Sequence, residues 1–382
     1  MRGLRLPLML FVAFRLSLLA FWPADQLACW SDYYYYYDIA NWVEQGYLPY
    51  IHYWVEYPPL FPYLSLLLYR LTPHYPAYAA ALALVQLAFE VGTFVLLFRL
   101  ALRALGDKRA ERVAWTYALL FAPVATWWLS FDAIAVFFLL LAVERWTAGH
   151  RTQSALAVGV GALVKWFPLL LLPVAARFRQ NWREVIGYAA VAMTVVAMVL
   201  GPLAALSPIY TLASLRSLGG RVSWQTVWAL LDGNLGTGAY HANRLDPAAA
   251  TTPQGNPARI PVWLTSLLFG ALYLWMWGRP SRDDGPCAVV RFIAITVLVF
   301  FLWSRGWSPQ WLAMLVPLLL LALPLERAVL YVVVLTFINI AEWPVLLSRG
   351  LNEWLYLTVS LRTGLFVLLA IELWREVRLV GR

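Results

Sequence analysis

The chain of 382 residues is 62% hydrophobic and only 13% charged, with a net charge of +9 and a mean hydropathy of +0.67. A soluble domain carries about twice that charged fraction, so the composition excludes a water-soluble globular protein. Apolar runs such as 169–176 and 315–323 lack the alternation of barrel strands and therefore predict helical membrane spans. The basic residues form short clusters between these runs, which is typical of cytoplasmic loops and not of nucleic-acid binding.

Hydropathy along the chain predicts an all-α polytopic membrane protein with ten continuous spans. They cover residues 4–22, 76–102, 112–129, 131–148, 184–206, 261–278, 287–304, 307–323, 327–347 and 354–374. The first is predicted to be a retained helix, because Trp22-Pro23-Ala24-Asp25 is a poor cleavage site for a signal peptidase. We expect a single membrane domain over residues 1–382, with external loops at about 23–75 and 207–260.

The segment 154–178 has the length of one span but is interrupted by Lys165-Trp166-Phe167-Pro168. A single crossing would place the basic cluster 177–183 outside and would invert every later basic loop. A short hairpin with its apex at 165–168 keeps all basic clusters on the cytoplasmic side, so the positive-inside rule favours the hairpin. Irregular backbone at membrane depth requires a surrounding of protein or water, which places Lys165 in a cavity.

The first external loop contains an unusual stretch, residues 30–62, with the sequence WSDYYYYYDIANWVEQGYLPYIHYWVEYPPLFP. It holds no Lys or Arg but four acids, Asp32, Asp38, Glu44 and Glu56. Its many tyrosines and tryptophans suit the headgroup boundary, where a ring lies half in lipid and half in water. The stretch is therefore predicted to be an acidic, aromatic-walled site, with amphipathic helices, at the outer face of the membrane.

The second external loop, residues 207–260, includes a predicted interfacial helix at 223–231 and continues as a polar segment rich in Gly, Asn and Pro. The segment 235–258 is either a disordered tether or a flap that covers the substrate. The sequence alone leaves both interpretations open.

Ionisable residues at membrane depth cost at least about 2.5 kcal/mol each, so each one requires a partner or a function. Five fall in the outer half of the membrane or at its outer edge: Arg15, Asp132, Lys165, Arg305 and Glu342. Structural explanations exist for three of them, since Arg15 can reach the interface, Asp132 can cap a helix and Glu342 can pair with an arginine. Glu90 lies deeper, and the sequence assigns it no role.

The sequence predicts carboxylates in the first external loop and cations beneath them in the outer half of the membrane. This arrangement suits a transfer reaction at the outer leaflet. Lys or Arg would hold a lipid-phosphate leaving group, and a carboxylate outside the membrane would take the proton of an incoming hydroxyl. The chain has no Walker loop, Rossmann fingerprint or nucleophile elbow, which argues against a nucleotide donor. Four scattered histidines, and two cysteines expected on opposite sides of the membrane, predict neither a metal site nor a disulfide.

Five motifs follow one another along the chain: D-Y-Y-Y-Y-Y-D-I-A-N-W-V-E-Q-G-Y-L-P-Y (32–50), E-Y-P-P-L (56–60), F-D-A-I-A-V-F-F (131–138), K-W-F-P (165–168) and W-S-P-Q-W (307–311). In this combination the chain resembles the polyprenol-phosphate-mannose-dependent mannosyltransferases of the GT-C superfamily of integral-membrane glycosyltransferases. The resemblance extends from Arg15 to about Pro317. It implies a GT-C-like bundle of about ten to twelve membrane segments, including the hairpin.

The resemblance also implies an inverting transfer of one sugar, often mannose, from a polyprenyl-phosphate carrier to a glycan or glycolipid acceptor outside the cytoplasm. No cofactor or metal is implied beyond the lipid-linked donor. Asp32 is implied as the general base and Glu56 as the residue that orients acceptor or base, although Asp38 leaves the choice of base open. The donor phosphate is expected at Lys165, Arg305, Gln310 and Arg15, and the acceptor or sugar at Asp38, Tyr57, Asp132 and Glu342.

In-line attack on a sugar phosphate needs only a base on the acceptor side, because phosphate leaves without help from an acid. One carboxylate and buried cations are therefore sufficient for the reaction. Two other classes stay open: a transporter or flippase, which predicts inverted repeats and broken midplane helices, and a non-catalytic membrane subunit. A bacterial or archaeal plasma membrane is the expected location, since no organelle retention signal is present.

Overall fold

The computed structural model describes residues 2–179, 181–280 and 285–379, and these form helices without any named strand. The β-type backbone pairing in this part of the chain consists of two isolated β-bridges. The α-helices are α1 (Arg2–Phe21), α2 (Ala24–Leu27), α3 (Tyr33–Asn41), α4 (Leu60–Leu71), α5 (Tyr75–Leu105), α6 (Asp107–Leu119), α7 (Phe121–Trp127), α8 (Asp132–Thr147), α9 (Arg151–Val164), α10 (Leu171–Arg177), α11 (Trp182–Leu206), α12 (Pro208–Arg216), α13 (Val227–Asp232), α14 (Val262–Gly278), α15 (Pro286–Trp303), α16 (Leu312–Ala322), α17 (Leu325–Ile340) and α18 (Leu355–Leu379). Short 3-10 segments lie at Trp42–Gln45, Phe167–Leu170, Pro247–Thr251, Pro309–Trp311, Leu347–Arg349 and Asn352–Trp354, and a π-helix at Ala341–Leu346.

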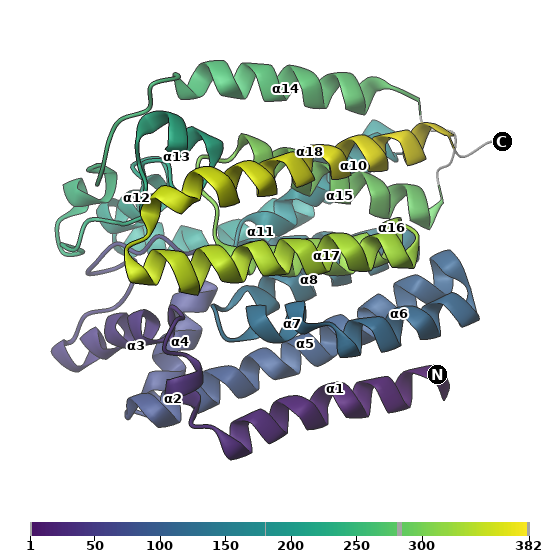
Figure 1. Ribbon diagram of the computed structural model, residues 1–382. Coiled ribbons are helices and arrows are strands. Elements are labelled where there is room, and N and C mark those ends of the chain that lie inside the picture. The colour runs from purple at the N-terminus through teal and green to yellow at the C-terminus, as the bar shows by residue number, and fades with distance from the viewer. Residues whose placement is uncertain (1, 180, 281–284, 380–382) are drawn as a thin grey trace.

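The long helices lie side by side in one bundle, and its two ends differ (Figure 1). The start of α1 and the end of α18 lie at one end, which we call the terminal end, whereas the short helices α2, α3, α4, α12 and α13 gather at the opposite end, the loop end. Basic residues connect the turns of the terminal end: Arg109 donates to the Leu323 carbonyl at 2.8 Å, and Arg112 pairs with Glu326. Arg103 and Arg145 likewise share Glu144, so basic residues of successive predicted clusters lie close together.

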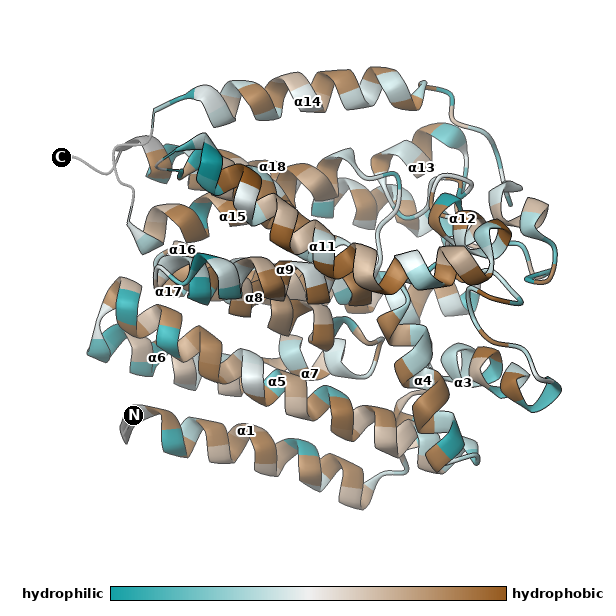
Figure 2. Cartoon of the chain, turned by 180° about the vertical axis from the view of Figure 1, so that it is seen from behind, coloured by the Kyte–Doolittle hydropathy of each residue, from teal (hydrophilic) through white to brown (hydrophobic). Residues whose placement is uncertain are grey.

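Six helices are long and apolar enough to cross a membrane, judged by length and composition over the described residues. They are α1, α5, α11, α15, α17 with its π-helical continuation, and α18. Four shorter apolar helical segments accompany them, at 60–71, 167–177, 262–278 and 309–322. Apolar residues dominate the long helices, and hydrophilic residues gather toward their ends (Figure 2). The predicted all-α, polytopic class is confirmed.

The predicted span 112–129 is not one continuous helix. It divides at Leu120, whose backbone is extended (φ −66°, ψ 135°), into α6 and α7. Pro123 explains the break, since it lacks the N–H that a continuous helix would bond to the carbonyl of Leu119. The break turns α7 inward, so that Trp127 is buried and donates to the Ala83 carbonyl of α5 at 3.0 Å.

The hairpin predicted for 154–178 is confirmed. Helix α9 ends at Val164, Lys165 is extended, and the chain returns through Phe167–Leu170 and α10. The return is fixed by Arg177, which donates to the carbonyls of Met276 and Arg279 at the C-terminal end of α14. Lys165 contacts Asp132, the first residue of α8. The apex therefore lies at the loop end of the bundle.

Packing divides the bundle into a buried centre and an apolar outer surface. Helices α8, α15 and α16 form the centre, with residues such as Leu140, Ile293 and Leu319 fully buried. Helix α14 lies at the outside, where Leu267 is 63% and Leu274 67% exposed. Exposed leucines along a helix that is apolar all round face lipid rather than water.

Candidate active site

The tyrosine-rich motif of the first loop forms helix α3, and Asp32 lies directly before its first residue. The Asp32 N–H donates to the Leu129 carbonyl at 3.0 Å, which joins the start of α3 to the turn before α8. The Tyr36 hydroxyl, one turn further along, donates to Asp32 Oδ2 at 3.2 Å. Asp32 therefore occupies a fixed position beside a positive helix end, which favours a carboxylate there.

The environment of Asp32 raises its pKa from 3.8 to about 6. Burial is the main cause, because it penalises the charged form, and the neighbouring Asp132 carboxylate raises the pKa slightly further. The positive charges of Lys165 and Arg221 and the hydrogen bond from Tyr36 act in the opposite direction. A carboxyl group with such a pKa is ionised at neutral pH and is a better proton acceptor than a free aspartate.

Lys165 at the hairpin apex makes a two-oxygen contact with Asp132, its Nζ lying 2.8 Å from Oδ1 and 2.7 Å from Oδ2. Asp132 is 1% exposed, and Ser130 donates a hydrogen bond to its Oδ2. The ammonium group also lies 5.1 Å from the centroid of the Phe131 ring and 5.4 Å from that of Phe167. The F-D and K-W-F-P motifs, predicted separately, thus form one buried polar contact.

Aromatic rings join this contact to the first loop. The Tyr36 and Tyr57 rings pack edge-on against Phe131, at centroid distances of 5.5 and 5.0 Å. Phe61 lies parallel to Phe131, with an interplanar angle of 11°. On the other side, Phe167 packs against Trp311 at 5.1 Å, which brings the W-S-P-Q-W motif to the same region. All five motifs converge at the loop end.

Glu56 is buried, at 4% exposure, and is fully occupied by partners. Arg244 of the second loop forms a salt bridge with it, and the Tyr35 hydroxyl donates to its Oε1 at 2.5 Å. The Trp54 indole N–H, nearby, donates to the carbonyls of Asn243 and Asp246 at 3.2 and 3.0 Å. Residues 243–246 therefore pack onto the first loop, so the segment 235–258, which we call the cover, is not a free tether. That it covers a substrate stays a prediction.

Arg305 holds the second loop in place from the opposite side. Its Nη1 lies 3.3 Å from Asp232 Oδ2, and its Nη2 donates to the Ile260 carbonyl. The predicted interfacial helix at 223–231 is shorter than expected: α13 begins only at Val227, because Thr226 caps it by accepting the Ala229 N–H at 3.3 Å. Trp224, which precedes the cap, packs closely over Gly306.

The remaining predicted residues lie in other environments. Glu342 is fully buried and pairs with Arg362 at 2.6 Å, as its structural interpretation anticipated. Asp38 is exposed on α3, and Gln310 is half-buried beside Trp311. Arg15 is completely buried and contacts Glu90, its Nε lying 2.6 Å from Oε2, which explains the otherwise unassigned Glu90.

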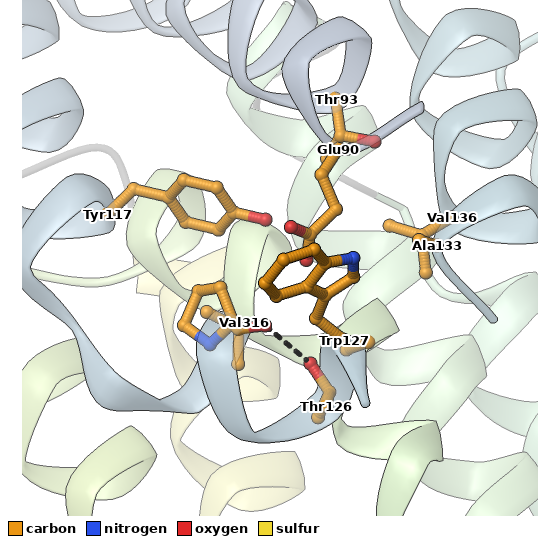
Figure 3. A pocket seen from close by; sticks show the side chains of 10 residues that line it. Glu90, Thr93, Tyr117, Thr126, Trp127, Ala133, Val136 and Val316 are labelled. Carbon is orange, nitrogen blue, oxygen red and sulfur yellow. Dashed lines mark hydrogen bonds between the residues drawn. The ribbon is translucent and has the colours of Figure 1, made fainter. Parts of the chain in front are cut away.

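A small cavity of about 10 Å³ lies beside Glu90 and is lined by residues of α5, α6, α7, α8 and α16. Figure 3 shows the Glu90 carboxylate and the Tyr117 hydroxyl pointing toward each other across it. Its size corresponds to roughly one water molecule. The cavity is far too small for a sugar, so the Arg15–Glu90 pair belongs to the bundle interior rather than to a substrate site.

Four charged residues with contacts at the loop end escaped the sequence analysis: Arg221, Asp232, Arg244 and Arg362. Arg221 and Arg244 lie in irregular parts of the second loop, where no periodicity indicates which side chains point inward, and Asp232 is the last residue of α13. A signal did exist for Arg362, since it is a charged residue within the apolar span 354–374. Within the described residues, no group of three His, Cys, Asp or Glu side chains is placed to hold a metal ion.

Comparison with known proteins gives the family. No curated protein matches the sequence. Among solved structures, the apo oligosaccharyltransferase of Archaeoglobus fulgidus is 14% identical with a TM-score of 0.43, over 96% of this chain and 54% of that protein. The same enzyme tethered to an acceptor peptide with an NVT sequon is also 14% identical, with a TM-score of 0.33, over 94% and 55%. The chain thus spans about half the length of that oligosaccharyltransferase.

The sequence model of glycosyltransferase family 87 matches residues 54–304. The matched region includes the E-Y-P-P, F-D and K-W-F-P motifs and the whole second loop. This confirms the resemblance to membrane glycosyltransferases and favours a transferase over a transporter or a non-catalytic subunit. The match covers most of the chain, which therefore belongs to glycosyltransferase family 87.

Proposed function

We propose that this glycosyltransferase moves one sugar, mannose, from a polyprenyl-phosphate carrier to a glycan or glycolipid acceptor, with inversion at the anomeric carbon. Asp32 is the general base of this reaction. Tyr57 and the rings around Phe131 form the wall against which the sugar packs. Glu56 orients the acceptor side through its fixed contacts with Tyr35 and Arg244. The proposal rests on family membership and on the environment of Asp32.

One observation carries the assignment of the base. Glu56, Asp132 and the other buried acids at the loop end each form an ion pair with Arg or Lys. Asp32 forms none within 4.0 Å in the described part of the chain, although it is half-buried. An acid that is neutralised by a salt bridge is a poor proton acceptor, whereas Asp32 keeps its acceptor capacity and a raised pKa. Asp38 lacks an ion pair too, but it is exposed.

The reaction needs few groups from the protein. The acceptor hydroxyl attacks the anomeric carbon while its proton passes to Asp32 Oδ1 or Oδ2, and the bond from the anomeric carbon to the phosphate oxygen breaks. Polyprenyl phosphate leaves as an anion and needs no acid, unlike the alcohol leaving group of a hydrolysis. The aromatic wall orients the sugar ring, and positive side chains stabilise the phosphate charge. We propose that no metal or organic cofactor takes part.

The orientation in the membrane follows from the basic clusters. They gather at the terminal end of the bundle, as the contacts of Arg109 and Arg112 show. Under the positive-inside rule this supports a cytoplasmic terminal end and an external loop end. We propose a plasma-membrane enzyme whose site faces away from the cytoplasm, where nucleotide sugars are absent and a lipid-linked donor is required.

The test is sugar transfer by the purified chain from synthetic polyprenyl-phosphate-mannose to extracted membrane lipids. We expect Asp32→Asn to reduce kcat/KM by roughly 100-fold to 10,000-fold, the range for a lost general base. Asp38→Asn is the matched control, because it removes an exposed acid from the same helix, and we expect it to keep wild-type activity. Full activity of Asp32→Asn, or loss of activity in Asp38→Asn alone, would reject Asp32 as the base. Absence of transfer by the wild type, with glucose and arabinose carriers also inactive, would reject the donor class.

A further inference from the structure

The inference concerns Arg221, a half-buried arginine of the second loop. Three other cations at the loop end form ion pairs: Arg244 with Glu56, Arg305 with Asp232, and Lys165 with Asp132. Arg221 has no carboxylate oxygen within 4.0 Å of its nitrogens among the described residues. A partly desolvated positive charge without a counter-ion is unfavourable unless a ligand supplies the negative charge.

The guanidinium of Arg221 is held rigidly. Its central carbon lies 3.6 Å from the Trp224 ring centroid and 4.3 Å from that of Tyr240. Nη2 donates to the Gly238 carbonyl at 2.6 Å and Nη1 to the Tyr240 hydroxyl at 3.3 Å, whereas Nε is buried without a partner. Two of its five N–H groups are therefore used, and the planar donor face keeps capacity for an oxyanion.

The backbone around this arginine is fixed to the rest of the site. The Trp224 N–H donates to the Arg305 carbonyl at 3.0 Å, and the Trp307 N–H donates to the Trp224 carbonyl at 3.1 Å. A Cβ at position 238 would lie 2.5 Å from Arg221 Nη2, so only glycine permits this close approach. Arg221 is thus attached to the W-S-P-Q-W motif and is oriented before any ligand binds.

Arg221 and Asp32 act on each other across the site without direct contact. The positive charge of Arg221 lowers the pKa values of Asp32 and Tyr57 against the larger effect of burial, which raises both. In an inverting transfer, the base and the leaving phosphate lie on opposite faces of the anomeric carbon. A base and a phosphate-binding cation must therefore be near but separated by the sugar; the paired carboxylates of inverting hydrolases are likewise about 6.5–9.5 Å apart.

We propose that Arg221 binds the phosphate of the lipid-linked donor and of the polyprenyl phosphate product, through the N–H groups of its guanidinium that Gly238 and Tyr240 do not use. This inference rests on the proposed function and goes beyond it by assigning the phosphate to the second loop. Lys165 and Arg305, each already paired with an aspartate, then position the surrounding structure. Arginine suits this task because its planar donors match two oxygens of a phosphate at once.

The experiment measures binding of sugar-free polyprenyl phosphate to the full chain in nanodiscs, with neutral polyprenol and inorganic phosphate as comparison ligands. We expect Arg221→Gln to raise the Kd for polyprenyl phosphate roughly tenfold or more, as for a lost charge-assisted hydrogen bond, and to leave polyprenol binding unchanged. Arg216→Gln, at an exposed arginine of the same loop, is the matched control and should bind like the wild type. Inorganic phosphate should bind far more weakly than the lipid.

The outcomes separate this inference from the proposed function. A wild-type Kd in Arg221→Gln, with normal sugar transfer by the wild type, overturns the role of Arg221 alone. Failure of the wild type to bind polyprenyl phosphate overturns the carrier class and this inference together. Equally tight binding of inorganic phosphate overturns the lipid assignment.

A second measurement covers the case in which Arg221→Gln does not fold. Phenylglyoxal modification of the wild type, mapped by mass spectrometry, should be slowed at Arg221 but not at Arg216 when polyprenyl phosphate is added. Equal modification of Arg221 with and without the lipid would overturn the inference.

Discussion

Two regions of the molecule bring an arginine and an acid together, and they do so in opposite ways. In the bundle interior, Arg15 and Glu90 touch at 2.6 Å, both nearly inaccessible, beside a cavity of about 10 Å³. At the loop end, Arg221 and Asp32 are half-buried and influence each other without contact. The interior pair satisfies its own charges and supports the fold. The open pair leaves both charges available for a substrate.

The largest expected effect breaks the interior pair. Glu90→Gln removes the charge that balances Arg15, so we expect a loss of about 3–5 kcal/mol in unfolding free energy, the range for an orphaned buried charge. Thermal unfolding of the detergent-solubilised protein measures it. The double substitution Arg15→Met with Glu90→Leu is the control and should recover most of the loss, because both charges are then absent. A wild-type melting temperature in Glu90→Gln would contradict a structural role for this pair.

A smaller effect is expected at the contact between the two loops. Arg244→Gln leaves Glu56 with only the hydrogen bond from Tyr35, so we expect local opening of the cover at a cost of about 1–3 kcal/mol. Limited proteolysis should then cleave within residues 235–258 faster than in the wild type. Arg259→Gln, at an exposed arginine of the same loop, should keep the wild-type cleavage rate. Equal cleavage of Arg244→Gln and wild type would refute the idea that this ion pair holds the cover closed.

The mildest test changes only pH. Asp32 must be ionised to accept a proton, and its pKa is about 6, so kcat/KM should be constant above pH 7 and fall tenfold per unit below about pH 6. Removing Arg221 should move this acid limb to higher pH, because its charge favours the ionised carboxyl group. A limb near pH 4 would mean that the base is an acid in an ordinary, solvated environment. The pH series from 4.5 to 8 with polyprenyl-phosphate-mannose decides between them.

The comparison also explains which charges sequence reasoning could interpret. It expected Glu342 at the acceptor and offered pairing with an arginine as the structural alternative, because an acid within an apolar span needs a counter-charge. Arg362 fulfils this alternative. It expected Lys165 and Arg305 to bind phosphate because both are cations near the outer surface. In the folded chain each contacts an aspartate, and Arg221 is the cation without an ion pair among them. The position of a charged residue along a predicted span indicates how deep it lies in the membrane, but it does not indicate which residue it contacts.

The sequence by itself determined the membrane class, the order of the spans, the hairpin and the position of the acidic aromatic loop. These follow from local composition, since a bilayer requires long apolar runs and keeps charges at their ends. The tertiary structure alone decided which acid stays unpaired. Glu56 finds Arg244 across 188 residues and Arg305 finds Asp232 across 73, and contacts between distant segments leave no periodic trace in a single sequence. Asp32 and Arg221 become candidates for the base and for phosphate binding because neither forms an ion pair within the described part of the chain.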